Sequence, residues 1–330
     1  MPKKAEDQEG ALTKVVIASN HLGREFINEL WDLYPDVEFV AAYEESEQQA
    51  AAVDADVFFG WPSLTSFQAA RQLKWMACPG TGIDQYTAVP EFVESDIPLT
   101  NAPGAHVTPM AEHVIGMMIS LAHNYRQLFR EQDERVFDGP KWAGRITELR
   151  GRTMGIYGLG EIGSAIARRA GAFEMRVLAV DPHPAEVPDA VAECRGLDRL
   201  DDLMKVSDWL VIAAPFIPAT KATIDARRLA LMKPGSWVVI ISRGGIVDEQ
   251  SLAEALASGH LAGAGIDATE IEPLPQDSPL WDLENVMLTQ HASALSPELY
   301  EGRRQVFKDN LARFLAGEPL QHLCDMKAGY

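Results

Sequence analysis

The glycine-rich stretch between residues 153 and 163 constrains the fold of this chain more than any other feature. Residues 153–157 read as a short buried strand, and residues 161–170 carry apolar side chains at helical spacing. Gly158, Gly160 and Gly163 form G-x-G-x-x-G between the two. In a βαβ unit the first glycine allows a tight turn, the second lets the backbone approach a pyrophosphate, and the third lets helix and strand pack closely. The free N–H groups of the helix would hold the anion.

The residues that follow strengthen this interpretation, because the motif alone is a weak signal. Residues 176–180 predict a second strand, and Asp181 stands at its end, close to the spacing expected for the acid that binds the adenosine ribose. An aspartate there repels a 2′-phosphate, and no Arg or Lys follows at 182–185. The sequence therefore favours NAD over NADP.

Length and composition limit the remaining possibilities. With 330 residues the chain has room for two domains, and its net charge of −19 argues against nucleic acid and anionic membranes as partners. Three widely spaced cysteines indicate a reducing, cytoplasmic compartment without disulfides or a structural metal. Residues 1–10 contain no apolar run, so we expect a frayed tail and no signal peptide.

Strand and helix patterns alternate along the chain, which predicts parallel sheets covered by helices. We expect an α/β protein with two doubly wound domains, in which a Rossmann NAD-binding domain at 108–296 is inserted in a flavodoxin-like substrate domain at 1–107 plus 297–330. The second sheet is predicted from six strands, near 153–157, 176–180, 209–213, 237–242, 263–267 and 286–289. A long helix is predicted from Met110 to Phe129.

Three ionisable residues follow strands of the second sheet, namely Arg243, Glu272 and His291. The carboxyl ends of parallel strands face the crevice where a dinucleotide binds, so we expect the three side chains to converge there. Together they suit reduction of a 2-oxo acid: Arg holds the carboxylate and polarises the carbonyl, His donates the proton, and Glu holds the imidazolium. Each residue alone would more often be structural or solvated, and the convergence is what favours catalysis.

Several segments resemble the NAD-dependent D-isomer-specific 2-hydroxyacid dehydrogenases. Besides the glycine turn, residues 241–248, 264–275 and 288–294 look like the family segments R-G-x-x-V-D, G-x-D-V-x-x-x-E-P-L-P and T-P-H-x-x. Residues 79–84, 100–104 and 214–220 match further family segments. The resemblance runs in order from about 75 to 298, and it identifies the family far better than the substrate.

The resemblance implies roles for individual positions. Arg243, Glu272 (rather than Glu270) and His291 become the catalytic residues, with Arg243 and His291 also contacting cofactor and substrate. Backbone N–H groups of Thr81 and Gly82 would hold the substrate carboxylate. Further cofactor contacts are implied for Thr108, Glu161, Ile162, Ala214, Pro215, Thr220, Ile241 and Asp267, the last toward the nicotinamide carboxamide, beside Gly158, Gly160, Gly163 and Asp181. The helix from Met110 corresponds to the family's dimer segment, so a homodimer is implied.

The sequence leaves the substrate open. Glyoxylate or hydroxypyruvate reduction is the main reading, with a 3-phosphoglycerate-type dehydrogenase and a non-enzymatic NAD-sensing, corepressor-like scaffold as alternatives. No basic cluster is evident beside 60–63 or 79–84 to hold a phosphate, and Trp61 could either shape the side-chain pocket or belong to the core. Glu272 stands where formate-oxidising members carry Gln. Ala213, Ile240 and Gln290 depart from the family pattern without removing a catalytic group.

Overall fold

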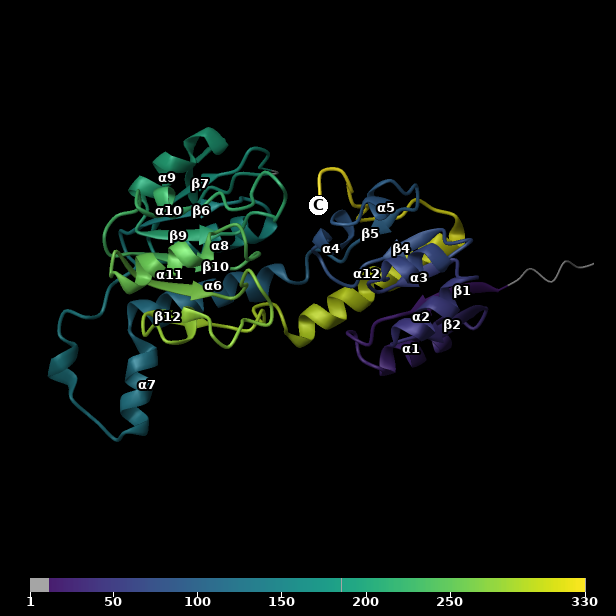
Figure 1. The fold of residues 1–330 in the computed structure, drawn as a ribbon, viewed down its shortest axis with the longest axis horizontal. Coiled ribbons are helices and arrows are strands. Elements are labelled where there is room, and N and C mark those ends of the chain that lie inside the picture. Colours follow the sequence, from purple (N-terminus) through teal and green to yellow (C-terminus); the bar gives the residue numbers. More distant parts are fainter. Residues whose placement is uncertain (1–11, 185, 330) are drawn as a thin grey trace, which may run out of the picture. The chain divides into compact units, whose positions relative to one another are not determined.

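The computed structural model describes residues 12–184 and 186–329, and the predicted frayed tail lies outside them. These residues form two compact units. One unit comprises the chain up to Ala105 together with the segment from Pro297 onward, and the other comprises His106–Ser296. Each unit is a parallel sheet with helices on both faces (Figure 1).

The first unit contains a five-stranded sheet of order β2-β1-β3-β4-β5. Every pairing in it is parallel. This is the flavodoxin-like order, in which the chain changes direction between β1 and β3. The strands are β1 (Thr13–Ile17), β2 (Val37–Ala41), β3 (Val57–Phe59), β4 (Trp75–Ala77) and β5 (Leu99–Thr100).

Helices cover both faces of this sheet because its strands are apolar on both sides. Helices α1 and α12 bury Phe26, Leu30, Phe307 and Leu311 against one face, and helices α2 to α5 pack on the other. The helices are α1 (Glu25–Leu33), α2 (Glu45–Ala52), α3 (Leu64–Ala69), α4 (Asp84–Thr87), α5 (Pro90–Val93) and α12 (Pro297–Ala316). Helix α12, the last helix, thus packs on the sheet of the first unit.

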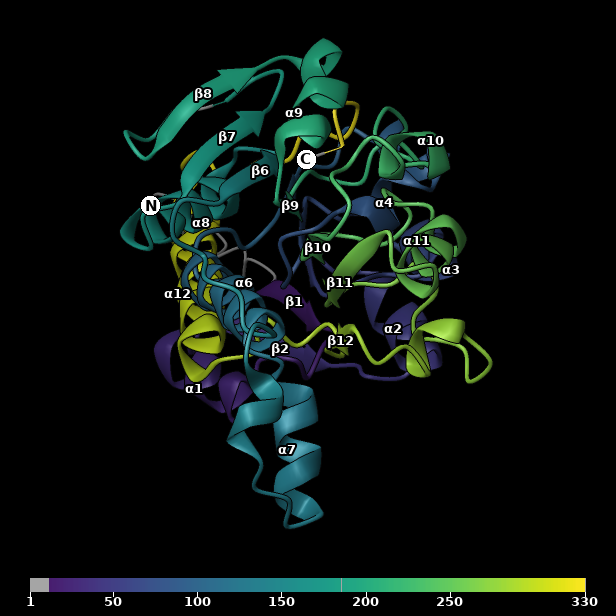
Figure 2. The ribbon, with the colours of Figure 1, turned by 90° about the vertical axis from the view of Figure 1, so that its left-hand side faces the viewer.

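The second unit contains a seven-stranded sheet of order β12-β11-β10-β9-β6-β7-β8, again parallel throughout (Figure 2). Its strands are β6 (Thr153–Tyr157), β7 (Arg176–Val180), β8 (Val191–Arg195), β9 (Trp209–Ile212), β10 (Ser236–Ile240), β11 (Leu261–Ile266) and β12 (Val286–Leu288). The prediction of six strands was wrong, because β8 was missed. This edge strand buries only Val191 and exposes Ala192, Glu193 and Arg195, so it lacks an apolar pattern.

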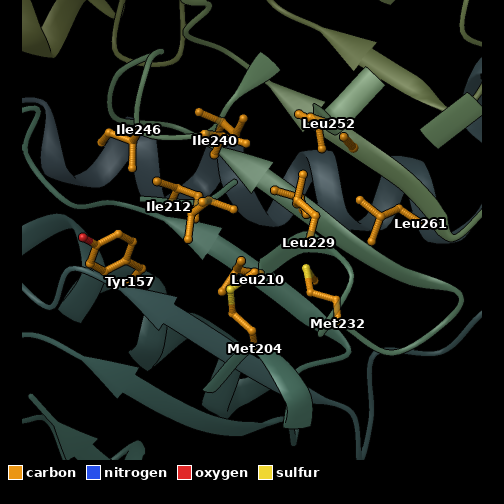
Figure 3. Packing of buried hydrophobic residues seen from close by; sticks show 14 of the residues in the cluster. Tyr157, Met204, Leu210, Ile212, Leu229, Met232, Ile240, Ile246, Leu252 and Leu261 are labelled. Atoms are coloured by element: carbon orange, nitrogen blue, oxygen red, sulfur yellow. The ribbon is translucent and has the colours of Figure 1, made fainter. Parts of the chain in front are cut away.

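Two cores lie on the two faces of this sheet. One contains Leu210, Ile212, Ile240 and their neighbours, part of which Figure 3 shows. Side chains of α9 (Leu200–Val206), α10 (Ala226–Leu229) and α11 (Glu249–Ala257) belong to the same core. The other lies under α6 (Val107–Ala122) and α8 (Glu161–Ala172). Short 3₁₀ turns occupy Gly139–Trp142, Leu197–Arg199 and Pro279–Trp281.

The single helix predicted from 110 to 129 is two helices. Helix α6 ends at Ala122, and α7 (Tyr125–Asp133) begins after Asn124, which is left-handed at φ 56°. Asparagine tolerates this conformation, and its side-chain amide donates to the Arg145 carbonyl at 2.7 Å. The apolar period continues through the break, which is why the sequence pattern hid it. Both views show α7 extending away from the rest of its unit (Figures 1 and 2).

The fold-class prediction, two parallel-sheet α/β domains with Rossmann-like and flavodoxin-like orders, is confirmed. Among the described residues, no helix is both long and apolar enough to cross a bilayer.

Candidate active site

Three neighbouring strands of the seven-stranded sheet end beside the predicted catalytic residues. Strands β10, β11 and β12 are adjacent and parallel, so the loops after them emerge at one edge. Arg243 follows β10, Glu272 follows β11 and His291 follows β12. The topology therefore brings these residues to the same edge of the sheet, from positions up to 48 apart in sequence.

The imidazole of His291 and the carboxylate of Glu272 form a direct pair. Nδ1 of His291 lies 2.8 Å from Oε2 of Glu272, and both side chains are about two-fifths exposed. The other carboxylate oxygen accepts the Thr269 N–H at 3.1 Å, which fixes the plane of the acid. With Nδ1 donating to the carboxylate, Nε2 is the ring nitrogen that remains for proton transfer. The pair thus has an orienting acid on one side of the ring and a partly exposed nitrogen on the other.

A buried carboxylate holds the turn that carries His291. Asp267 is almost completely buried, and its Oδ1 accepts the Thr289 hydroxyl at 2.6 Å and the Ala292 N–H at 3.0 Å. Its Oδ2 accepts the Ser293 N–H at 3.3 Å, and its carbonyl accepts the His291 N–H at 2.9 Å. His291 itself is left-handed, with φ 52°. Asp267 therefore determines the shape of a turn that a histidine would otherwise rarely adopt.

His113 of α6 completes this network. Its Nε2 lies 3.0 Å from the Thr289 hydroxyl and 3.9 Å from Oδ1 of Asp267. Burial lowers the pKa of His113, and the nearby Asp267 partly opposes this shift. Neither Thr289 nor His113 was predicted to belong to the site, since nothing local to either residue indicates that helix α6 reaches the end of β12.

Asp267→Asn should weaken both the fold and the chemistry. The amide would present an N–H group to donors that now meet an oxygen, and an unsatisfied buried polar group costs about 1–3 kcal/mol. We expect a lower denaturant midpoint and reduced turnover because the His291 turn loses its anchor. Urea unfolding and saturating-substrate kinetics check this, with the exposed Asp282→Asn as control. Native stability together with native turnover in Asp267→Asn would contradict the role of this carboxylate.

The loop that carries Arg243 lies against the loop that carries Glu272. A Cβ atom at Gly244 would come within 2.1 Å of the Thr269 backbone, so only glycine permits this approach. Nη1 of Arg243 donates to the Ser242 carbonyl at 2.9 Å, and the side chain is partly exposed. The backbone next to Arg243 therefore contacts the facing loop at Thr269, which precedes Glu272 by three residues.

The glycine turn lies at the point where the strand order of the second sheet reverses. Strands β6 and β9 are neighbours there, and a Cβ at Gly158, which has φ 97°, would meet the Ala214 nitrogen at 2.4 Å. A Cβ at Gly163 would meet the Gly158 carbonyl at 2.2 Å, so helix and strand are as close as predicted. A Cβ added at Gly160, by contrast, would meet nothing within 4 Å.

The first turn of α8 fits an anion. The N-cap residue Gly160 supplies no side chain to the helix N–H groups, and Gly160 and Glu161 are exposed. Uncapped, exposed N–H groups beside open space are what a pyrophosphate requires. The residues present therefore fit a dinucleotide, with Ile162 half-buried beneath the same turn.

Asp181 contacts this turn directly. Its Oδ2 accepts the Leu159 N–H at 2.7 Å, and its Oδ1 accepts the His183 N–H at 2.7 Å. The carboxylate at the end of β7 is thus fixed next to the glycines.

The other residues implied to contact the cofactor lie in the same unit. Thr108 is in the first turn of α6, Ala214 and Pro215 follow β9, and Ile241 follows β10 and is fully buried. The Thr220 hydroxyl donates to the Pro215 carbonyl at 2.7 Å and accepts the Ile217 N–H at 2.9 Å. Both of these partners lie in the same loop as Thr220.

The predicted substrate-carboxylate loop belongs to the first unit. The Thr81 hydroxyl donates to the Ala102 carbonyl at 3.1 Å, and the Asn101 amide donates to the Thr81 carbonyl at 2.7 Å. Gly82 accepts a weak bond from the Cys78 thiol at 3.8 Å. The loop after β4 is thus fixed by the segment after β5. Among the described residues, no group of three or more His, Cys, Asp or Glu side chains could hold a metal ion.

A parallel sheet of this order, with a glycine turn at its reversal point, is the fold of dinucleotide-binding proteins. Residues 115–293 match the model of the D-isomer specific 2-hydroxyacid dehydrogenase NAD-binding domain, and the chain belongs to that family. The family prediction is therefore confirmed.

Individual relatives and solved structures agree with this assignment. The chain is 34% identical over 262 residues to D-3-phosphoglycerate dehydrogenase of Methanocaldococcus jannaschii, covering 78% of this chain and 49% of that protein. It is 32% identical over 285 residues to hydroxypyruvate reductase of Thermotoga maritima, covering 86% and 85%. The structure of an NADPH-dependent glyoxylate/hydroxypyruvate reductase of Sinorhizobium meliloti with NADP and sulfate has a TM-score of 0.83 at 26% identity, covering 96% and 100%. The chain spans about half the length of the first curated relatives it matches.

Proposed function

We propose that this chain interconverts a small 2-oxo acid and the corresponding 2-hydroxy acid, with hydride exchanged at C2. The observation that carries the proposal is the His291–Glu272 pair, 2.8 Å apart at the same sheet edge that carries the glycine turn. A bound nicotinamide dinucleotide would supply or accept the hydride. The side chains of this chain bind the substrate and move the proton.

His291 acts as the acid and base through Nε2. Glu272 holds Nδ1, so the ring can carry a proton at Nε2 to the oxygen that develops charge during reduction and can remove it in the reverse direction. The carboxylate stabilises the imidazolium of the protonated state. Arg243, whose guanidinium offers a fork of donors, orients the substrate carboxylate and polarises the carbonyl.

The remaining predicted residues complete the proposal. The N–H groups of Thr81 and Gly82 hold the substrate carboxylate, and the first unit serves as the substrate domain. The pyrophosphate lies on the turn from Gly158 to Gly163. Ile241, Ala214, Pro215 and Thr108 line the cofactor site, and Asp267 both contacts the carboxamide and anchors the His291 turn.

NAD is the proposed cofactor in preference to NADP, because the Asp181 carboxylate stands beside the turn. Similar structures, including the Sinorhizobium enzyme, are NADP complexes, and substitution of Asp181 distinguishes the two cofactors. Asp181→Asn should lower the ratio of kcat/KM with NADH to kcat/KM with NADPH by about tenfold, the equivalent of 1.4 kcal/mol of lost repulsion. Steady-state kinetics with both cofactors measure it. The control is Asp189→Asn, a nearby exposed position, which should leave the ratio unchanged. A ratio in Asp181→Asn equal to that of the parent chain would contradict the assignment.

Glyoxylate and hydroxypyruvate are the first substrates to test, since the Thermotoga relative and the Sinorhizobium structure carry those activities in their names. The phosphoglycerate dehydrogenases among the relatives keep 3-phosphoglycerate as the second candidate. NADH oxidation with a panel of 2-oxo acids, and NAD reduction with 3-phosphoglycerate, decides between them. Tight NADH binding without turnover on any substrate would favour an NAD-sensing scaffold instead.

A homodimer is the proposed assembly, formed through α7 and the segment after it. Helix α7 buries none of its side chains, Phe129 is largely exposed and Phe137 completely so. A groove of about 370 Å³ runs between α7 and β12, lined by Tyr125, Phe129, Trp281 and Met287 among others. Exposed apolar surface of this kind marks an interaction site.

Three free thiols support the further proposal of a cytoplasmic location.

Light scattering after size exclusion tests the assembly. We expect a dimeric mass for the parent chain and a monomeric mass for Phe129→Glu with Phe137→Glu, because each change places a carboxylate in the apolar face of an already acidic chain. The matched control is Phe173→Glu, an exposed phenylalanine just after α8. A monomeric parent chain, or a dimer that survives the double change, would overturn this interface.

A further inference from the structure

Two aromatic side chains stand at the reversal point of the five-stranded sheet. His21 follows β1 and Trp61 follows β3, and these strands are neighbours although β2 intervenes in sequence. Their ring centroids are 5.9 Å apart, edge to face. In open α/β sheets, ligands bind outside the carboxyl ends of the strands at such a reversal point. The feature is therefore in the part of the first unit where a ligand is expected.

Helix α12 brings a cation to this position. Nη1 of Arg303 lies 2.7 Å from Nε2 of His21, although 282 positions separate the two residues. Tyr300, one turn earlier in the helix, has its ring centroid 5.4 Å from that of His21. We name this group, consisting of His21, Trp61, Tyr300 and Arg303, the α12 cluster. All four side chains are partly exposed, so the cluster is open to a ligand.

The α12 cluster borders the loop proposed to hold the substrate carboxylate. The Trp61 ring lies 3.3 Å from the position of a Cβ added at Gly80, which directly precedes Thr81 and Gly82. Arg303 also lines a cavity of about 10 Å³ with Cys78 and Asn101. That cavity has room for at most one water, so a carboxylate does not fit inside it.

Arg303 is half-buried without an acidic partner among the described residues. Its Nε is buried and has no hydrogen-bond acceptor, and the groups that act on it electrostatically are Cys78 and Tyr300. Burial lowers the pKa of Arg303, and burial together with Arg303 lowers the pKa of His21, which leaves a neutral imidazole as the acceptor. Although the chain is rich in acidic residues, none of those in the described part acts electrostatically on this cation. A desolvated charge without a counter-ion is costly, so an anion from outside would stabilise it.

We propose that the α12 cluster binds a second carboxylate of the substrate, so that 2-oxo dicarboxylic acids are the preferred substrates. This inference rests on the proposed reduction of 2-oxo acids. The Thr81–Gly82 loop takes the carboxylate beside the reacting carbonyl, and Arg303 takes the one at the far end.

The charge of the cluster distinguishes a carboxylate from a phosphate. Arg303 supplies one positive charge and a planar fork that matches a carboxylate. His21 is neutral and the other two members are uncharged aromatic rings, so a phosphate with nearly two negative charges would remain half-neutralised. The observations thus favour a singly charged group.

Kinetics with matched substrates test the assignment. Oxaloacetate and 2-oxoglutarate carry the second carboxylate, whereas pyruvate and 2-oxobutyrate lack it. In Arg303→Met, which keeps an unbranched apolar stem but removes the guanidinium, we expect kcat/KM for the diacids to fall about tenfold or more through KM, and that for the monoacids to stay unchanged. Arg313→Gln removes a charge from a partly exposed position of α12, where the residue pairs with Glu318, and should change neither. An equal loss on both substrate sets, no loss on either, or a parent chain that prefers the monoacids or a phosphorylated 2-oxo acid would overturn the proposal.

A binding measurement separates this inference from the proposed reaction. Glutarate has both carboxylates but no carbonyl, and calorimetry measures its binding without turnover. We expect the parent chain and Arg313→Gln to bind it, and Arg303→Met to bind it about tenfold more weakly or not at all. No reduction of any 2-oxo acid, combined with glutarate binding that depends on Arg303, would refute the reaction and keep the anion site. Failure of the parent chain to bind glutarate, or equal binding by Arg303→Met, would refute the site.

Discussion

His291→Asn should lower turnover by about 10²–10⁴-fold, the usual contribution of a general acid or base, while NADH binding is retained. Asparagine is chosen because it tolerates the left-handed backbone at this position, whereas alanine would add strain. Its amide has no proton to give at neutral pH, so the loss should appear in kcat. Single-turnover NADH oxidation and NADH fluorescence titration measure the two quantities separately.

Glu272→Gln provides the matched comparison. Glutamine can still accept the Nδ1–H bond of His291 but carries no charge, so the ring stays oriented while the imidazolium loses its counter-ion. We expect turnover between those of the parent chain and His291→Asn. Near-parent turnover in His291→Asn would contradict the assignment of the proton transfer to this residue, whatever the outcome for Glu272.

Gly158→Ala should unfold or severely destabilise the second unit. Alanine would be forced to φ 97°, a conformation that costs about 1–3 kcal/mol, and its Cβ would lie 2.4 Å from the Ala214 nitrogen. Relieving that collision requires β6 and β9 to separate at their carboxyl ends, which adds about 1–3 kcal/mol of overpacking. Thermal and urea unfolding measure the sum. Gly259→Ala, with φ 75° and nothing within 4 Å, isolates the backbone contribution and should cost much less.

Gly160→Ala should behave in the opposite way. A Cβ there meets nothing within 4 Å, so stability should match the parent chain. The methyl group would occupy the space in front of the α8 N-terminus, and NADH binding should weaken by at least about tenfold, or 1.4 kcal/mol. A stable variant that binds NADH normally would show that the pyrophosphate does not lie on this turn.

Local sequence patterns were sufficient for most of the fold. The glycine spacing, the buried strands and the strand-end positions of Arg243, Glu272 and His291 are short-range features, and the parallel topology follows from their alternation. The patterns failed where local signals were weak. Strand β8 is an exposed edge, and the break at Asn124 depends on a backbone conformation that apolar periodicity does not record.

The long-range contacts of the site could not be predicted. His113 reaches Thr289 across 176 positions, and Arg303 reaches His21 across 282. The sequence showed no basic residue near Trp61 because the cation arrives from the last helix, and only the packing of Phe307 on the first sheet brings it there. The hydrogen bonds of Asp267 to the 289–293 turn belong to the same class, since all four of these donors depend on how β11 and β12 pair.

Isotope transfer tests the proposed hydride chemistry most directly. NADH labelled with deuterium at C4 of the nicotinamide, on one face at a time, is incubated with the chain and the best 2-oxo acid of the panel, and the product is analysed by mass spectrometry and NMR. We predict a 2-hydroxy acid with one deuterium at C2, delivered from only one of the two faces. A product without deuterium at C2, or no 2-hydroxy acid at all, would contradict the account.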